Sequence, residues 1–167
     1  GEAFDPSELV EGLGHDYLLA TNLFKSYGCG ADAHPAVEAV RQALADRSLV
    51  PEAIASVSVR VHAQGARLAA AASHNAHVAR LSLPYVIARS LRGQSLGLEA
   101  FEEAARREAV TQELMRRVAV HEDAEASRAH PREQRARAEV VLTDGSVLAA
   151  SFVLGPNGRA AWPTRAG

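Results

Sequence analysis

The feature that most constrains the fold is a hairpin pattern towards the C-terminal end of the chain. Apolar and polar residues alternate from Arg135 to Leu142, the pair Asp144-Gly145 follows, and the chain returns through Val147 to Val153. Alternation is typical of a strand with one buried face, and Asp-Gly between such runs favours a tight turn. The pattern therefore predicts two antiparallel strands lying side by side.

Two further strands are predicted upstream. Residues 56–62 alternate strictly, which places three valines on one inward face, and residues 118–121 form a short apolar run. Residues 124–133 are polar and irregular, so we expect a loop there. The sheet should therefore have about four strands.

Helices are predicted between these strands. Periodicity favours a helix over residues 35–46 and amphipathic helices over 98–105 and 108–116. The stretch 76–93 is also helix-prone, but Pro84 interrupts it, so we expect a fresh helix to start at that proline. The prediction is an α+β fold, an antiparallel sheet of about four strands with helices packed on one face.

Composition narrows the classes of function. A chain of 167 residues is long enough for one domain with a real core. Its net charge of −2 gives no electrostatic case for nucleic acid or an anionic membrane, and no apolar run approaches membrane-spanning length. Its single cysteine excludes an internal disulfide and fits a reducing compartment. We therefore expect a cytoplasmic protein without nucleic-acid or membrane partners.

The candidate chemistry lies in residues 22–35, which hold the only Lys and the only Cys of the chain. Lys25 is a compact point charge in a chain whose other basic residues are all Arg. Gly28 and Gly30 flank Cys29 and would let a ligand approach the main chain. A glycine-rich loop that enters a helix N-terminus is a natural seat for a carboxylate or phosphate.

An ordinary loop is the alternative for this stretch. Pro35 suits the first turn of a helix, and Asp32 or His34 could cap that helix without binding anything. Cys29 has no legible His–Asp pair beside it, so we interpret it as lining rather than as a nucleophile. From spacing alone the two interpretations are close to even.

No metal site is predicted from the histidines. His74 and His77 lie three positions apart and could share a metal on a helix, but no third ligand is evident, which favours solvated side chains. His62 and His121 lie on predicted strands, and we expect them to face solvent or to be satisfied locally.

Three stretches resemble the MmgE/PrpD family, in the same order along the chain. They are Leu13-Gly14-His15-Asp16-Tyr17 with Phe24-Lys25-Ser26-Tyr27-Gly28-Cys29 and His34-Pro35, then Leu81-Ser82-Leu83-Pro84-Tyr85, and then Val140 to Leu148. Family members typically read F-K-P-Y-P-C-C and F-S-L-P-Y in the first two. The chain is similar to the smaller, C-terminal lid domain of this family, which includes 2-methylcitrate dehydratase, cis-aconitate decarboxylase and iminodisuccinate epimerase.

The chain departs from the family pattern at four of these positions. Ser26 and Gly28 replace two usual prolines, Gly30 stands where a second Cys or His is common, and Leu81 replaces Phe. These changes loosen the loop and leave open which acid is the substrate, and whether it loses water, loses CO2 or is epimerised.

The resemblance implies a lid domain of a lyase that acts on a small di- or tricarboxylic acid. The lid would cover an all-helical domain of the same enzyme, which carries the principal acid–base residues and forms a homodimer at full length. Lys25 and Tyr85 are implied as the catalytic pair that meets substrate carboxylates. The implied substrate-binding residues are Cys29, Gly30, His34 and Ser82. No metal and no cofactor are implied, and the 167-residue chain alone should be inactive.

The domain boundaries follow from the same resemblance. We expect residues 1–12 to be a linker from a preceding domain, 13–155 the lid domain and 156–167 a tail. The first residue is Gly1 and the only Met is Met115, as expected for a chain that was processed or excised from a longer enzyme. The alternative function is a free-standing module that binds a small acid, or acts by interaction, without turnover.

Overall fold

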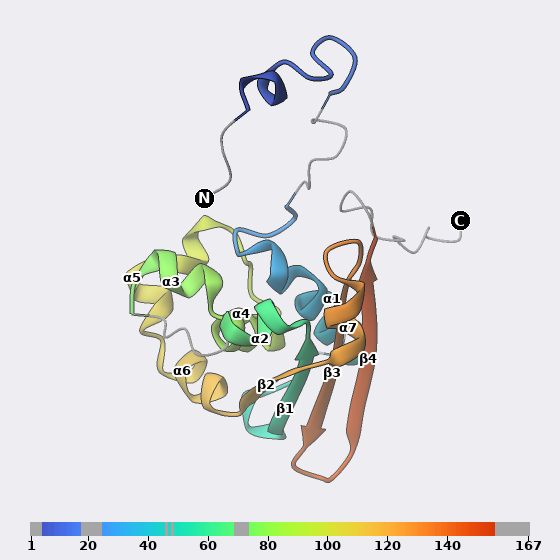
Figure 1. Ribbon diagram of the computed structural model, residues 1–167. Helices are drawn as coiled ribbons and strands as arrows, with labels where there is room; N and C mark the ends of the chain where they lie inside the picture. The colour runs from blue at the N-terminus through green and yellow to red at the C-terminus, as the bar shows by residue number, and fades with distance from the viewer. Residues whose placement is uncertain (1–4, 18–24, 46, 48, 69–73, 156–167) are drawn as a thin grey trace, which may run out of the picture.

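The computed structural model describes residues 5–17, 25–45, 47, 49–68 and 74–155 (Figure 1). Its four strands are β1 (Ile54–Val61), β2 (Val118–Glu122), β3 (Gln134–Leu142) and β4 (Val147–Leu154). They form one sheet in the order β2-β1-β3-β4. The predicted α+β fold with a four-stranded sheet is therefore confirmed.

The sheet is antiparallel except at one edge. β1 pairs antiparallel with β3, and β3 pairs antiparallel with β4, but β2 runs parallel to β1. A parallel pair needs a long crossover connection, and the helical segment between β1 and β2 supplies it. The predicted hairpin is confirmed, with Gly145 at a φ of +85° in the turn that joins β3 to β4.

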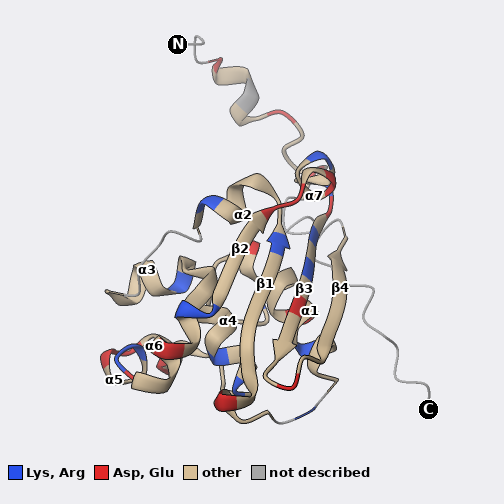
Figure 2. Cartoon of the chain, turned by 90° about the horizontal axis from the view of Figure 1, so that it is seen from below, with Lys and Arg blue, Asp and Glu red and all other residues tan. Residues whose placement is uncertain are grey.

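Two helices cover one face of the sheet. Helix α1 (His34–Leu44) packs against β3 and β4, and helix α4 (Leu83–Leu91) contacts both α1 and β2. Figure 2 shows the strands in front and these two helices behind them. Helix α6 (Ala109–Arg116) packs against α4.

The core lies between the sheet and these helices. The side chains of the inward-facing strand residues are all completely or almost completely buried. These residues are Val57, Val59, Val61, Ala136, Ala138 and Val140. Burying one Val side chain contributes about 1.5–3 kcal/mol, so this set holds α1 and α4 to the sheet. Arg60 of β1, with Arg137 and Glu139 of β3, lies on the opposite face, as the alternation predicts.

Pro84 divides a helical stretch as predicted. Helix α3 (Ala76–Leu81) ends where α4 begins, and Ser82 lies between them with extended backbone angles of −74° and 103°. The Ser82 hydroxyl accepts a hydrogen bond from the Tyr85 N–H at 3.4 Å, which caps α4. Pro84 lies in the first turn of α4, where its missing N–H costs nothing.

The prediction of a loop over residues 124–133 is wrong in its first half. Helix α7 (Ala124–Ala129) forms there because the Asp123 carboxylate accepts hydrogen bonds from the N–H groups of Glu125 and Ala126, at 2.8 and 3.1 Å.

The predicted helix over 98–105 is two short pieces, η6 (Leu98–Phe101) and α5 (Glu103–Arg106), separated at Glu102, whose ψ is 160°.

The remaining helical elements are short. They are η1 (Pro6–Leu9), η3 (Ala31–Ala33), η4 (Pro51–Ala53) and α2 (Ala63–Arg67). Residues 18–24 and 69–73 lie outside the described part, as does the predicted tail 156–167. Within the described part, every helix is too short or too polar to cross a membrane.

Candidate functional site

The loop that carries the candidate residues is held on both sides by backbone hydrogen bonds. The Gly28 N–H donates to the Leu96 carbonyl at 2.8 Å, and the Gly30 N–H donates to the Arg80 carbonyl at 2.8 Å. A Cβ on Gly28 would lie 3.0 Å from the Leu96 oxygen and 3.3 Å from a ring carbon of Phe101. The glycines therefore allow close packing against the protein's own main chain, in addition to any approach by a ligand.

Three of the predicted site residues come together around this loop. Lys25 is exposed, whereas Cys29 and His34 are buried, with 3% and 5% of their surface accessible. Burial raises the pKa of the Cys29 thiol to about 11, against a smaller lowering by the Lys25 charge. Burial also lowers the pKa of His34, and Lys25 lowers it further. Near neutral pH a protonated thiol and a neutral imidazole therefore lie close to an exposed ammonium.

The start of α1 is not capped by either of the two residues that the sequence suggested. Its N-cap is Ala33, so neither Asp32 nor His34 is the capping residue. The short η3 turn leads directly into α1, and the N–H groups of Ala33 and His34 donate within it to Gly30 and Ala31. The Nε2 atom of His34 is buried without a hydrogen-bond partner.

Sequence reasoning missed a second layer of polar residues beneath the loop. The Tyr27 hydroxyl donates a short hydrogen bond to Glu38, and the Arg41 guanidinium lies 4.9 Å from the centre of the Tyr27 ring. The His34 and Tyr27 rings are 5.1 Å apart. Spacing could have revealed this group, since His34, Glu38 and Arg41 recur at four and three residues and share one face of a helix.

Tyr85 and Ser82 lie in the packed interior. Tyr85 is completely buried, and its hydroxyl donates a short hydrogen bond to the Ala100 carbonyl. Its ring centre lies 6.0 Å from that of Phe101, the residue that also limits the space at Gly28. Phe101 thus joins the Tyr85 segment to the Lys25 loop. Direct convergence of Lys25 and Tyr85 on one ligand stays a prediction.

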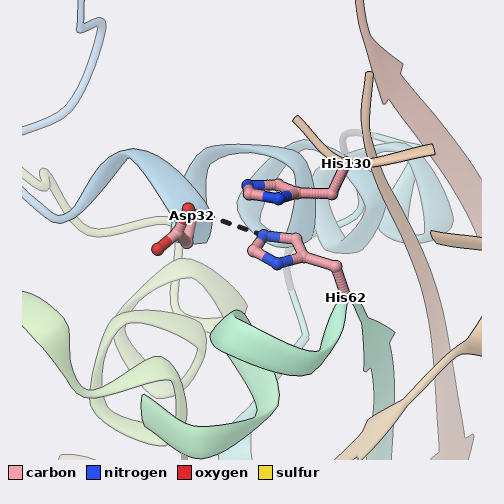
Figure 3. A group of neighbouring side chains, drawn as sticks. All are labelled: Asp32, His62 and His130. Atoms are coloured by element: carbon pink, nitrogen blue, oxygen red, sulfur yellow. Dashed lines mark ion pairs between the residues drawn. The ribbon is translucent and has the colours of Figure 1, made fainter. Parts of the chain in front are cut away.

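A different cluster contains the residues best suited to a metal. One ligand atom each from Asp32, His62 and His130 lies within 4.8 Å of the others. Figure 3 shows the three side chains side by side. His62 has 2% of its surface accessible, so of the two expectations for it, facing solvent or being satisfied locally, the first is wrong. His121, His74 and His77 are exposed, as expected. No regular spacing connects positions 32, 62 and 130, which is why the sequence did not suggest this group.

These features define an α+β domain in which a helix-entry loop carries a single ammonium above a buried thiol and imidazole. The family model of the MmgE/PrpD C-terminal domain matches residues 27–165, so the chain belongs to the MmgE/PrpD family through that domain. None of the curated proteins compared with the chain matches it significantly. The resemblance identified from the Lys25 and Tyr85 motifs is therefore confirmed at the level of the family.

Proposed function

We propose that the chain is the lid domain of an MmgE/PrpD-like lyase that acts on a small di- or tricarboxylic acid. The family match supports this, because the family includes dehydratases and decarboxylases. The observation that carries the proposal is the position of Lys25, the only Lys of the chain, which is exposed beside buried His34 and Cys29. The lid would share its site with an all-helical domain of the same enzyme.

Lys25 binds a carboxylate of the substrate in this proposal. Loss of water or CO2 from a citrate-like acid develops negative charge on the carbon next to a carboxylate, and a fixed cation stabilises that charge. Lys25 is suited to the task because its ammonium is exposed. In this proposal the proton abstraction belongs to the helical domain. The Cys29 thiol is protonated near pH 7 and so is not a base, and burial lowers the pKa of the His34 imidazole and makes it a weaker base than a free one.

His34, Cys29 and Gly30 form the wall of the site beneath the carboxylate. The buried Nε2 of His34 has no hydrogen-bond partner within the protein, so it can form a hydrogen bond with an oxygen of the ligand. Ser82 holds the start of α4, and so fixes Tyr85 one turn further along. Tyr85 acts as a hydrogen-bond donor or proton relay once its hydroxyl exchanges the Ala100 carbonyl for a substrate oxygen.

The test is turnover by the full-length enzyme that contains this domain, against a panel of di- and tricarboxylic acids that includes 2-methylcitrate. Lys25→Ala should lower kcat/KM by about 100-fold, because deleting one donor to a developing anion typically costs that much. Lys25→Arg, which keeps the charge, should recover part of it. Arg107→Ala is the matched control, since its side chain is 78% exposed in a surface pair with Glu103.

Turnover of every acid within a few fold of wild type in Lys25→Ala would refute this role. A binding module without turnover is the second candidate, favoured by the protonated Cys29 thiol and by the burial of His34, whose lowered pKa makes it a weak base. Calorimetry with the same acids separates the two candidates. Binding that depends on Lys25, without product formation by the full-length protein, would support the module instead of the lyase.

A further inference from the structure

Three segments far apart in the chain meet at Asp32, His62 and His130. Asp32 lies in η3, His62 directly follows β1, and His130 directly follows α7, before β3 begins. Their ligand atoms all lie within 4.8 Å of one another. Figure 3 shows both imidazole rings with a nitrogen-bearing edge towards the Asp32 carboxylate. One oxygen and two imidazole nitrogens therefore converge on a single point.

Hydrogen bonding leaves one of these groups unsatisfied. The Nε2 atom of His62 is buried and has no hydrogen-bond partner, although the Asp32 carboxylate oxygen lies 3.5 Å away. A buried polar nitrogen without a partner is costly, so its position calls for an occupant. The contact to Asp32 is an electrostatic approach rather than a hydrogen bond, so an ion would lie to one side of the line that joins the two atoms.

The distance between His62 and Asp32 fits a small tetrahedral ion. With bonds of about 2.0–2.2 Å from zinc to imidazole nitrogen and carboxylate oxygen, neighbouring ligands lie about 3.3–3.5 Å apart. The 3.5 Å between His62 Nε2 and the Asp32 oxygen matches that edge. Two imidazoles with one carboxylate are typical zinc ligands, and three protein ligands leave a fourth position for water or another small ligand.

We propose that Asp32, His62 and His130 bind one divalent transition-metal ion of the zinc class. The ion ties the loop that carries Cys29 and His34 to the end of β1 and to the segment between α7 and β3. Its role is to hold the loop in position, so the proposal stands apart from the action of Lys25 on a substrate. It replaces the expectation, drawn from the sequence, that the chain has no metal site.

Two local adjustments accompany binding. The His62 and His130 rings are stacked, with centres 4.1 Å apart and planes 18° from parallel, so one must tilt to direct its nitrogen at the ion. His130 is the one with space, since it is only half-buried, whereas His62 is enclosed. The His62 proton must also move to Nδ1, which ends a long 3.4 Å hydrogen bond from the Gly65 N–H.

The competing account is an Asp32–His62 pair with no metal. The Gly65 N–H donates to His62 Nδ1, which in a neutral ring leaves the proton on Nε2, facing Asp32. That account predicts a stable cluster that ignores metal ions. The two accounts therefore differ in a direct binding measurement.

The experiment strips the full chain with a chelator and titrates it with Co²⁺, then with Zn²⁺ against a chromophoric chelator. We expect one equivalent to bind, with the visible absorption of four-coordinate Co²⁺. Asp32→Asn keeps the shape of the side chain, and His130→Ala removes the half-buried ligand. Each should weaken Zn²⁺ binding at least tenfold, whereas His121→Ala and His77→Ala, which change exposed histidines, should leave it unchanged.

Thermal unfolding separates lost binding from lost folding. Zn²⁺ should raise the Tm of the wild type and of His77→Ala, because a ligand that binds only the folded state stabilises it. It should raise the Tm of a folded Asp32→Asn protein less than that of the wild type, in line with its weaker affinity. Absence of binding by the wild type, or equal affinity in Asp32→Asn, would overturn the proposal in favour of the Asp–His pair.

Discussion

The motif residues of the two segments that resemble the family differ in their exposure to solvent. Around the Lys25 loop the ammonium is exposed and the buried Nε2 of His34 lacks a partner. Around α4 the Tyr85 hydroxyl donates to Ala100, and the Ser82 hydroxyl accepts from the Tyr85 N–H. A buried hydroxyl with an internal partner holds a fold together, whereas an exposed ammonium can meet a ligand. In the proposed function the loop therefore contacts the substrate and α4 supports it, although α4 also buries Arg89 Nε and Ser90 Oγ without a hydrogen-bond partner.

The charged groups of the two segments differ as well, because one is paired within the protein and the other is exposed. Glu108 accepts from Arg92 in a short ion pair and from the Thr111 hydroxyl at 2.8 Å, which ties α6 to the end of α4. Lys25, in contrast, exerts its charge on two groups that are neutral near pH 7, the Cys29 thiol and the His34 imidazole. A change of the exposed Lys25 should therefore alter turnover, and changes around α4 should alter stability.

Reversing the loop charge should have the largest effect. Lys25→Glu places an anion where the substrate carboxylate binds, so we expect kcat/KM of the full-length enzyme to fall by roughly 1,000-fold. Stability should stay within about 0.5 kcal/mol, since the side chain is exposed. Arg107→Glu, at another exposed cation, is the control for charge alone. Unfolding of the Lys25→Glu protein would remove the distinction between the two segments.

Gly28→Ala should destabilise the domain by about 1–3 kcal/mol, the usual cost of forcing a group into a packed site. The added Cβ would lie 3.0 Å from the Leu96 carbonyl oxygen, a backbone atom that cannot rotate away. Urea denaturation measures the difference, with Ser26→Ala, two positions away and exposed, as the control. Equal stability of the two variants would mean that the loop is not held against Leu96.

Tyr85→Phe should cost about 1–2 kcal/mol of stability, because it leaves the buried Ala100 carbonyl without its donor. Tyr27→Phe removes a hydroxyl that is only part-buried, where water can replace the bond to Glu38, so its cost should be smaller. Both are measured by urea denaturation. A fall in turnover of Tyr85→Phe at temperatures where it stays folded would add the proposed relay to this structural role.

The smallest effect should be a dependence of stability on acid pH. The Arg92 guanidinium, as the largest cause, holds the pKa of Glu108 at about 2, below its ordinary 4.5. A lowered pKa stabilises the folded state above pH 4.5, and this contribution fades as the pH falls towards 2. A third of the side chain is exposed, so we expect less than about 1 kcal/mol. Glu108→Gln should flatten the stability profile in this range, and an unchanged profile would contradict the assignment.

Local periodicity was enough to predict much of the fold. The β3–β4 hairpin and β1 were predictable because alternate residues of a strand face the same side of the sheet. In β1 the valines occupy the buried side. The division at Pro84 was predictable because proline lacks an N–H. Helix α7 was missed because its six residues show no apolar stripe. It depends on the Asp123 cap and on packing against β3 and α2.

The candidate site was predictable only in part. The motifs indicated Lys25, Cys29 and His34, which the fold brings together. They did not indicate that Tyr85 is buried under its bond to Ala100, because a hydrogen bond across fifteen residues leaves no spacing signal. His62 was misjudged because the alternation of β1 points it outward, but the chain leaves the sheet at that residue to begin α2.

By itself the sequence determined the strands, the hairpin, the helix break and the family, since each rests on neighbours within a few residues or on a contiguous motif. Tertiary structure alone decided that β2 runs parallel to β1, that Phe101 links the two motif segments, and that Asp32, His62 and His130 meet. The reason is physical. Contacts between distant segments depend on how the core packs, and packing is a property of the whole chain.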